Sequence, residues 1–198
     1  LRIGELRAEK VDCAPYSKSR FDNALREIRG LTRETPDVFE TRMKQLCAMS
    51  GVVIVFVAEL PGTHLSGATR WLATDKALIM LSLRHKSDDH LWFTFFHEAG
   101  HIILHSKKAA FLDEEEVESN AEERQADQFA ANKLIPEKVY TSFVEKGEYT
   151  PLSIQDFAKS LEIAPGIVVG RLQHEHIVSW RSPLNYLKAR FRLIETSD

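Results

Sequence analysis

Cysteine is scarce in this sequence, and long apolar runs are missing. The two cysteines, Cys13 and Cys47, have no second cysteine at metal-ligand spacing, so we expect free thiols in a reducing compartment rather than a disulfide framework. The longest apolar run, from Gly51 to Ala58, falls far short of the roughly 18 residues that a membrane-spanning helix needs. Together with the lack of a recognisable signal peptide, these absences predict a cytoplasmic chain with no membrane segment.

An excess of positive charge is also missing. The chain of 198 residues carries 26 Lys and Arg against 29 Asp and Glu, which gives a formal net charge of −3. Because nucleic-acid-binding domains usually present a basic surface, we do not expect this chain alone to bind DNA directly. Its 43% of hydrophobic residues are enough to bury a core. The chain starts with Leu1 rather than methionine, which suggests a piece of a longer protein.

Helical and strand patterns occupy separate parts of the chain, which favours an α+β fold. We expect an N-terminal helical region over 1–50, a core over 51–150 and a C-terminal helical region over 151–198. Strands are predicted at 52–57, 68–73 and 77–83, the last two as a hairpin. Helices are predicted at 20–29, from Thr35-Pro36 to Met49, at 90–106, 120–134 and 136–146, and as two short helices within 153–174; Ser119 and Glu122 have the spacing of a capping box for the helix at 120–134.

The run His97-Glu98-Ala99-Gly100-His101 fits the pattern H-E-x-x-H. Residues four apart on an α-helix lie on nearly the same face, so both imidazoles can reach one metal ion. Glu98 lies about 100° further round the helix, beside the ion rather than on it. Zinc lowers the pKa of a water molecule that it binds to about 7, and a carboxylate at this position can take the proton from that water. The pattern predicts a zinc hydrolase with Glu98 as the catalytic base.

Three features argue against a chance match in an ordinary helix. Aromatic and aliphatic residues surround the motif, so this helix should be buried, and buried histidines and a buried glutamate need partners. Gly100 costs about 1 kcal/mol of helix propensity relative to alanine, which predicts the close approach of another backbone or of a substrate. A carboxylate that can act as a third ligand follows downstream.

Glu123 is the candidate for this third ligand, with Glu118 and Glu122 as competitors in the same acidic stretch. Catalytic zinc sites commonly use three protein ligands. Asp127 lies one helical turn after Glu123 and can accept the second ring N–H of a ligand histidine. Ala126 is small enough to let the two helices pack closely. Manganese or another divalent ion remains open beside zinc.

Further candidates have simpler alternatives. His105 could bond to a ligand histidine, although a surface or helix-end position is the simpler interpretation. The strand at 77–83 could be an edge that pairs with substrate or an interior strand. Arg70 and Trp71 could line the cleft or belong to a half-exposed hairpin, and Tyr140 is one of several guesses for an oxyanion stabiliser. The other histidines are predicted to be solvated or structural: His64, His85, His90, His174 and His176.

The stretch from Ser153 to His174 has the cadence of a helix-turn-helix. Such a motif would make the chain a DNA-binding module. A helical hairpin packed on the core is the alternative, and the weak basic bias of this region favours the hairpin.

The order H-E-A-G-H, then E-R-Q-A-D-Q-F-A-A-N-K-L-I-P, resembles the ImmA/IrrE family of metallopeptidases. The resemblance implies a zincin-like fold of the gluzincin type, in which a small antiparallel or mixed sheet packs on the active-site helix. It also implies that Glu123 is the third zinc ligand and that Asp127 orients a ligand histidine. The matching downstream positions are Glu123, Ala126, Asp127, Phe129, Ala130, Leu134 and Pro136.

Members of this family accompany, or are fused to, helix-turn-helix repressors and antitoxins, and characterised members cleave such repressors under stress. The resemblance therefore implies a zinc-dependent endopeptidase whose partner is a DNA-binding repressor or antitoxin. The alternative is a transcriptional regulator or antitoxin component that keeps the fold without hydrolysing anything. The sequence predicts no particular oligomeric state.

Overall fold

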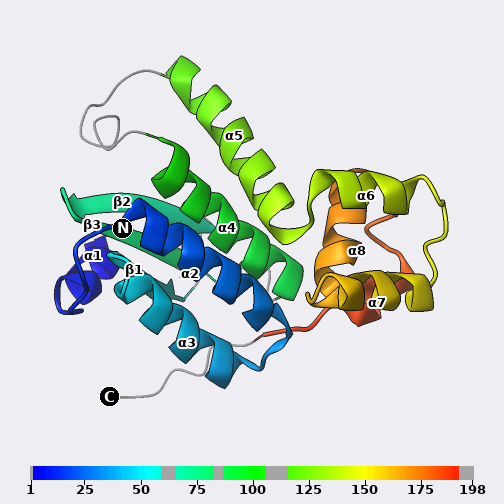
Figure 1. Cartoon of the computed structure of the whole chain (residues 1–198), viewed down its shortest axis with the longest axis horizontal. Coiled ribbons are helices and arrows are strands. Elements are labelled where there is room, and N and C mark those ends of the chain that lie inside the picture. The colour runs from blue at the N-terminus through cyan, green and yellow to red at the C-terminus, as the bar shows by residue number, and fades with distance from the viewer. Residues whose placement is uncertain (1, 59–65, 83–86, 106–115, 192–198) are drawn as a thin grey trace.

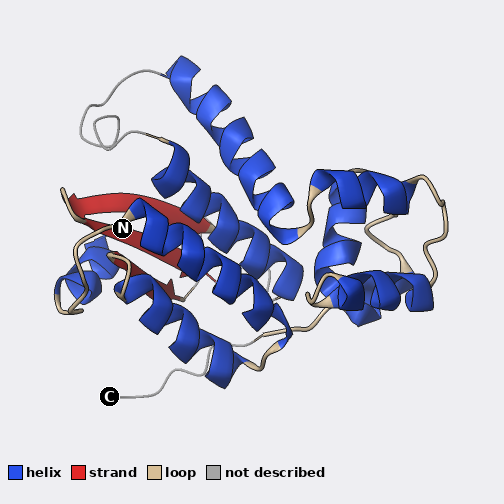
Figure 2. Cartoon of the chain, in the orientation of Figure 1, coloured by secondary structure: helices blue, strands red, loops and turns tan. Residues whose placement is uncertain are grey.

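A computed structural model describes residues 2–58, 66–82, 87–105 and 116–191 of the chain. Within these residues, helices pack on both faces of one three-stranded sheet, so the α+β prediction is confirmed (Figure 1, Figure 2). The first half contains α1 (Arg2–Glu9), α2 (Lys18–Gly30), α3 (Pro36–Ala48), β1 (Val52–Val57), β2 (Gly67–Ala73) and β3 (Lys76–Ser82). The second half contains α4 (Asp88–Leu104), α5 (Glu116–Leu134), α6 (Glu137–Val144), α7 (Pro151–Ser160) and α8 (Pro165–His174).

Most element ends follow local signals in the sequence. Pro36 is the first residue of α3 and Thr35 its N-cap, as predicted. Gly51, with φ of +88°, makes the turn into β1 that a residue with a side chain would strain. The predicted capping box is wrong, because α5 begins at Glu116 and Ser119 therefore lies within the helix.

The sheet has the strand order β1-β3-β2, with β3 parallel to β1 and antiparallel to β2. The hairpin prediction is confirmed, but the suggestion that 77–83 is an edge strand is wrong. Residues 77–81 are all buried, which is typical of a strand with a neighbour on each side and helices on both faces. Within the described residues the edges of the sheet are β1 and β2.

Alternation along the strands assigns each face of the sheet to different helices. Ile54 and Ile79 point to the face that packs against α2, α3 and α4, where Trp92 of α4 is fully buried. Val53 and Leu78 point to the opposite face, which Ala8 of α1 covers. The helix that carries the H-E-x-x-H motif is therefore fixed directly on the sheet.

The helical hairpin of α7 and α8 packs on α4, as the second interpretation of this stretch expected. The buried residues of α8 include Ile167, Val168 and Leu172, so the helix that would enter a DNA groove contributes to the core instead. Gly166 and Gly170 bring the α8 backbone against Asp88 and Asp89 at the start of α4. Figure 1 shows α6, α7 and α8 grouped at one end of the molecule.

Two arginines satisfy carbonyl groups at the C-terminal end of α5, which the helix itself cannot satisfy. Arg29 of α2 donates to Leu134 O at 3.0 Å, and Arg171 of α8 donates to Ile135 O at 2.6 Å. This end of α5 is therefore fixed by both the N-terminal and the C-terminal helices.

Other residues of the N-terminal part are structural. Trp71 is buried with its ring against Tyr16, and Arg70 forms an ion pair of 2.7 Å with Glu5, so neither supports the suggested role in a cleft.

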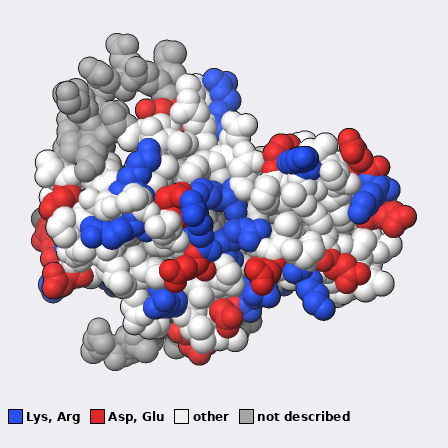
Figure 3. Space-filling model, in the orientation of Figure 1, with Lys and Arg blue, Asp and Glu red and all other residues white. Residues whose placement is uncertain are grey.

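Cys13 and Cys47 are free, as predicted. Among the described helices, none combines the length and the apolar character needed to cross a membrane. Both acidic and basic side chains occur on the face shown in Figure 3.

The carboxyl group of Asp88, at the start of α4, gives a pH prediction. Burial raises its pKa to about 6, against about 3.9 in an unfolded chain. The folded protein therefore binds this proton more tightly, and the stability contribution of Asp88 falls as pH rises from about 4 to about 6. One pKa unit is worth about 1.4 kcal/mol. We therefore expect the free energy of unfolding of Asp88→Asn, relative to that of wild type, to rise by about 2–3 kcal/mol as the pH increases from 4 to 7.

Urea unfolding of both proteins across this pH range measures the difference between them. A constant difference from pH 4 to pH 7 would show that Asp88 titrates normally.

Candidate metal centre

The histidines of the H-E-x-x-H motif lie on the side of α4 that faces α5. Their Nε2 atoms are 3.1 Å apart and their ring centroids 4.8 Å apart. This is the geometry that four-residue spacing on a helix predicts for His97 and His101. Both side chains are largely shielded, with 16% and 19% of their surface exposed.

Glu123 of α5 completes a group of three. Its two carboxylate oxygens lie 3.2 Å from His97 Nε2 and 3.3 Å from His101 Nε2. Ligand atoms about 2.1 Å from a tetrahedral ion lie about 3.4 Å from one another, so these separations fit a zinc ion. Among the described residues, His97, His101 and Glu123 therefore form a group whose side chains could hold a metal ion. The structure brings the three residues together; their role as ligands stays a prediction.

Close packing of the two helices positions Glu123. A Cβ atom on Gly100 would lie 3.1 Å from Ala126 Cα and 3.2 Å from a ring carbon of Phe129, which is tighter than nearly all real contacts of this kind. Of the two alternatives predicted for Gly100, another backbone or a substrate, the structure shows another backbone, and the expected role of Ala126 is confirmed. The glycine allows α5 to come near enough for its carboxylate to reach the histidines of α4.

Hydrogen bonds on the far side of each imidazole set its orientation. Asp127 Oδ1 lies 2.8 Å from His97 Nδ1, as expected, and His105 Nδ1 lies 3.0 Å from His101 Nδ1. When the Nδ1 atoms of His97 and His101 carry the protons of these two bonds, the Nε2 atoms of the same two residues keep a lone pair for the metal. Burial lowers the pKa of His101, which also favours the neutral, metal-binding form.

His105 has a larger role than a helix-end histidine. It does follow the last residue of α4, but its side chain is only 10% exposed, and its Nε2 atom lies 3.3 Å from Gln125 Oε1. The ring therefore connects His101 to α5. The less favoured interpretation of the sequence, a bond to a ligand histidine, is the one that the structure supports.

Glu98 is buried between α4 and β2. Thr69 Oγ1 donates a hydrogen bond of 2.7 Å to Glu98 Oε2. A Cβ atom on Gly67 would lie 2.7 Å from Glu98 Oε1, so the absence of a side chain there leaves room for the carboxyl group. Burial raises the pKa of Glu98, and the bond from Thr69 lowers it in part.

Thr69 and Gly67 were not foreseen from the sequence. They are two residues apart on one strand and so share a face, but only the packing of β2 against α4 shows that this face meets Glu98.

Several other sequence candidates lie elsewhere. Glu122 is 3.9 Å from His105 and outside the cluster, and the side chain of Glu118 lies outside the described residues. Tyr140 is buried with its ring beneath the guanidinium of Arg171, which removes it as an oxyanion stabiliser in this conformation. His64 and His85 lie outside the described residues.

Comparison with known proteins adds one finding. The model of a peptidase family, M78, which describes an IrrE N-terminal-like domain, matches residues 52–173. The match runs from the start of β1 into α8 and includes the whole cluster. No curated protein matched the chain.

Proposed function

The chain belongs to the peptidase M78 family of IrrE N-terminal-like domains, and from this membership and the geometry of the cluster we propose that it is a zinc-dependent endopeptidase. The observation that carries the proposal is the convergence of His97, His101 and Glu123 from two helices, with Glu98 buried next to them. Each of the two histidines also bonds to a group that fixes its orientation, His97 to Asp127 and His101 to His105.

The donor set fits a zinc ion, with two imidazole nitrogens and one carboxylate at suitable separations. When bound, the ion would act as a Lewis acid that polarises the peptide carbonyl and acidifies the attacking water. Three protein ligands leave a position for substrate and water.

Glu98 is suited to move the proton in both halves of the reaction. Its carboxylate takes a proton from the attacking water as the water oxygen bonds to the carbonyl carbon. Glu98 then passes this proton to the amide nitrogen when the C–N bond breaks. A carboxyl group with a raised pKa is suited to both roles, because it ionises nearer neutral pH. The hydrogen bond from Thr69 holds the carboxylate in one orientation.

β2, rather than β3, is the strand that offers an edge next to this carboxylate. Within the part of the chain that the structure describes, β2 pairs with β3 on one side and has no strand on its other side, and it carries Thr69. An extended substrate chain that adds to this edge would lie across the catalytic base.

The proposed substrate is a cytoplasmic DNA-binding repressor or antitoxin, as the family resemblance implies. Glu98 supports hydrolysis over a non-hydrolytic regulator, because a structural metal site does not need a buried and oriented base. The test is to sequence the genes adjacent to the one for this chain and to incubate the zinc-loaded protein with any helix-turn-helix repressor or antitoxin that they encode. Defined fragments on a gel and by mass spectrometry are expected, and an intact partner after long incubation would contradict this choice of substrate.

Asp127→Asn is expected to weaken zinc binding by about 10–100-fold, since removing a partner that orients a ligand histidine typically has this effect. Asn cannot accept the His97 Nδ1 proton as strongly as a carboxylate does. Competition with a chromophoric chelator measures the affinity. Asp156→Asn, an exposed change on α7, is the matched control and should bind zinc like wild type. Equal affinities for the two variants would show that Asp127 does not support the site.

A further inference from the structure

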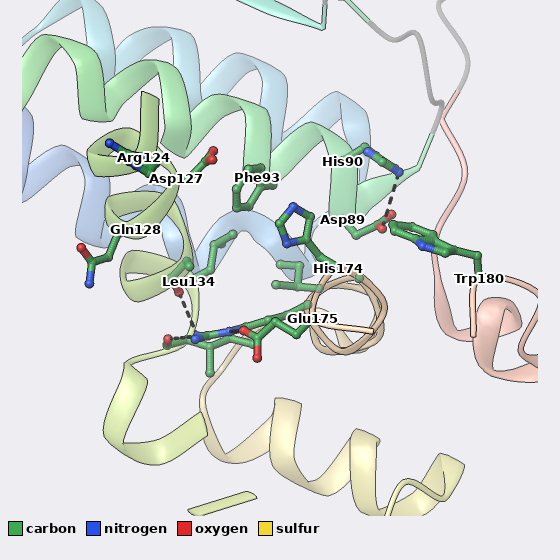
Figure 4. A pocket seen from close by; sticks show the side chains of 15 residues that line it. Asp89, His90, Phe93, Arg124, Asp127, Gln128, Leu134, His174, Glu175 and Trp180 are labelled. Carbon is green, nitrogen blue, oxygen red and sulfur yellow. Dashed lines mark hydrogen bonds and ion pairs between the residues drawn. The ribbon is translucent and has the colours of Figure 1, made fainter. Parts of the chain in front are cut away.

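A cavity of about 340 Å³ opens next to the metal cluster (Figure 4). Helix α4 contributes His90 and Phe93 to its wall, α5 contributes Asp127 and Ala131, and α8 contributes His174. Both α5 and α8 pack on α4, so the cavity occupies the space over α4 between the other two helices. Trp180, from the segment after α8, lies at the end near His90 and Asp89 in Figure 4.

The cavity lies directly beside the cluster of His97, His101 and Glu123. Phe93 lies one helical turn before His97, with the two ring centroids 6.3 Å apart. Asp127 both lines the cavity and bonds to His97. Adjacent residues of an extended peptide are about 3.3 Å apart along the chain. A peptide with a carbonyl group at the cluster would therefore bring the side chain of a neighbouring residue to the cavity.

The walls are mainly flat rings and aliphatic groups. Phe93 stacks near His174 with centroids 6.0 Å apart, and His90 stacks near Trp180 with centroids 6.4 Å apart. Leu134 and Ile167 add aliphatic surface. Ring-lined walls of this kind favour aromatic groups, which gain both buried area and ring contacts.

Asp89 and Arg171, the charged side chains of the cavity wall that are most shielded from solvent, each form an ion pair within the protein. The Oδ2 atom of Asp89, a residue with 7% of its side chain exposed, accepts a bond of 2.5 Å from Lys188, whereas its buried Oδ1 atom has no hydrogen-bond partner among the described residues. Arg171, 10% exposed, pairs with Glu175 at 2.9 Å and donates to the carbonyl of Ile135. Because the charges of Asp89 and Arg171 are balanced by Lys188 and Glu175, an ionic side chain would gain little from them, and apolar contact provides most of the recognition.

We propose that this cavity is a specificity pocket, and that it binds a bulky apolar, preferably aromatic, side chain adjacent to the scissile bond of the substrate. The proposal rests on the peptidase function proposed above. The volume suits one large side chain, because it lies near the lower end of the range of about 300–1,000 Å³ for ligand pockets.

Binding can be tested without catalysis. Trp180 is 50% exposed, whereas Trp71 and Trp92 are buried at 5% and 0%, so the indole N–H signal of Trp180 reports on the cavity in an NMR titration. N-acetyl-phenylalanine amide is expected to shift this signal in a saturable way, and N-acetyl-alanine amide and N-acetyl-lysine amide are not. Ala131→Phe, which fills the cavity, should reduce the affinity at least tenfold. Ala121→Phe, an exposed change on the same helix, should not.

Equal shifts with all three amides, or equal affinities of wild type and Ala131→Phe for the phenylalanine amide, would overturn the pocket. This result does not depend on whether the protein is a peptidase.

A peptide library incubated with the zinc-loaded protein then tests specificity. Cleavage sites are expected to share an aromatic or large aliphatic residue at one fixed position, with kcat/KM at least tenfold above that of the alanine equivalent. Trp180→Ala removes one wall and should reduce the preference for the aromatic peptide over its alanine equivalent. Tyr186 is an exposed aromatic residue outside the cavity, so Tyr186→Ala should leave this preference unchanged. Cleavage with no such preference overturns the pocket alone. A complete absence of cleavage overturns the peptidase function, while the titration still decides whether the cavity binds aromatic groups.

Discussion

Glu98→Gln is expected to abolish peptide cleavage while zinc stays bound. Glutamine has nearly the same shape and can keep the hydrogen bond from Thr69, but it cannot accept a proton from water. General acid–base catalysis typically contributes about 10²–10⁴-fold, so kcat should fall by at least about 100-fold. Cleavage of the preferred peptide gives the rate, and metal analysis of the purified protein gives the zinc content.

Glu122→Gln is the control for this change. It is the same substitution close to the cluster but outside it, and its kcat should match that of wild type. A Glu98→Gln protein that binds zinc and cleaves at the wild-type rate would exclude Glu98 as the base. Loss of zinc from this variant would mean that Glu98 supports the metal rather than the proton transfer.

Glu123→Gln is expected to have the second large effect, on metal affinity. The carboxylate contributes both a ligand atom and a negative charge next to two neutral imidazoles, and an amide oxygen is a poor substitute for zinc. We expect zinc affinity to fall at least about 100-fold, with peptide cleavage lost at zinc concentrations that saturate wild type. Chelator competition measures the affinity, and the zinc-induced rise in Tm provides a second readout.

The same control separates the two neighbouring glutamates. Glu122→Gln should bind zinc as wild type does, because its carboxylate faces His105 and not the cluster. The opposite result, with zinc lost in Glu122→Gln and kept in Glu123→Gln, would show that Glu122 and not Glu123 is the third ligand.

The cluster could be predicted from the sequence because its chemistry is tied to helical spacing. His97 and His101 lie one turn apart wherever that segment is helical, and Gly100 indicated that another backbone or a substrate approaches there. Glu123 was less certain, since spacing alone did not separate it from Glu118 and Glu122. The close contact with Ala126, seen only in the folded chain, decides which glutamate faces the histidines.

Partners that come together only through tertiary packing could not be predicted. Nothing local to Thr69 or Gly67 shows that β2 crosses α4 at Glu98. The position of β3 inside the sheet depends on its parallel pairing with β1, a contact between segments that are not neighbours in the chain. The unbroken apolar run from Ala77 to Leu81 was the available signal in the sequence. In an edge strand with one solvated face, apolar and polar residues would alternate.

The proposed pocket was missed for a related reason. His90 and His174 show no common spacing, since they reach the cavity from α4 and from α8, which are far apart in sequence. Each of them could only be treated as an isolated histidine until the packing of α8 on α4 was known.

The contact between Gly100 and Ala126 has a consequence for ion selectivity. Two of the three candidate ligands are fixed to each other by one helix, so the size of the ion that fits depends on how far away α5 carries the third. Zinc–oxygen bonds are about 2.0–2.2 Å and calcium–oxygen bonds about 2.3–2.6 Å, a difference smaller than the width of one methyl group. If the three candidate ligands bind a metal as proposed, Gly100 and Ala126 would set the ionic radius that the centre accepts without contacting the ion, and we expect a bulkier side chain at either position to favour larger cations.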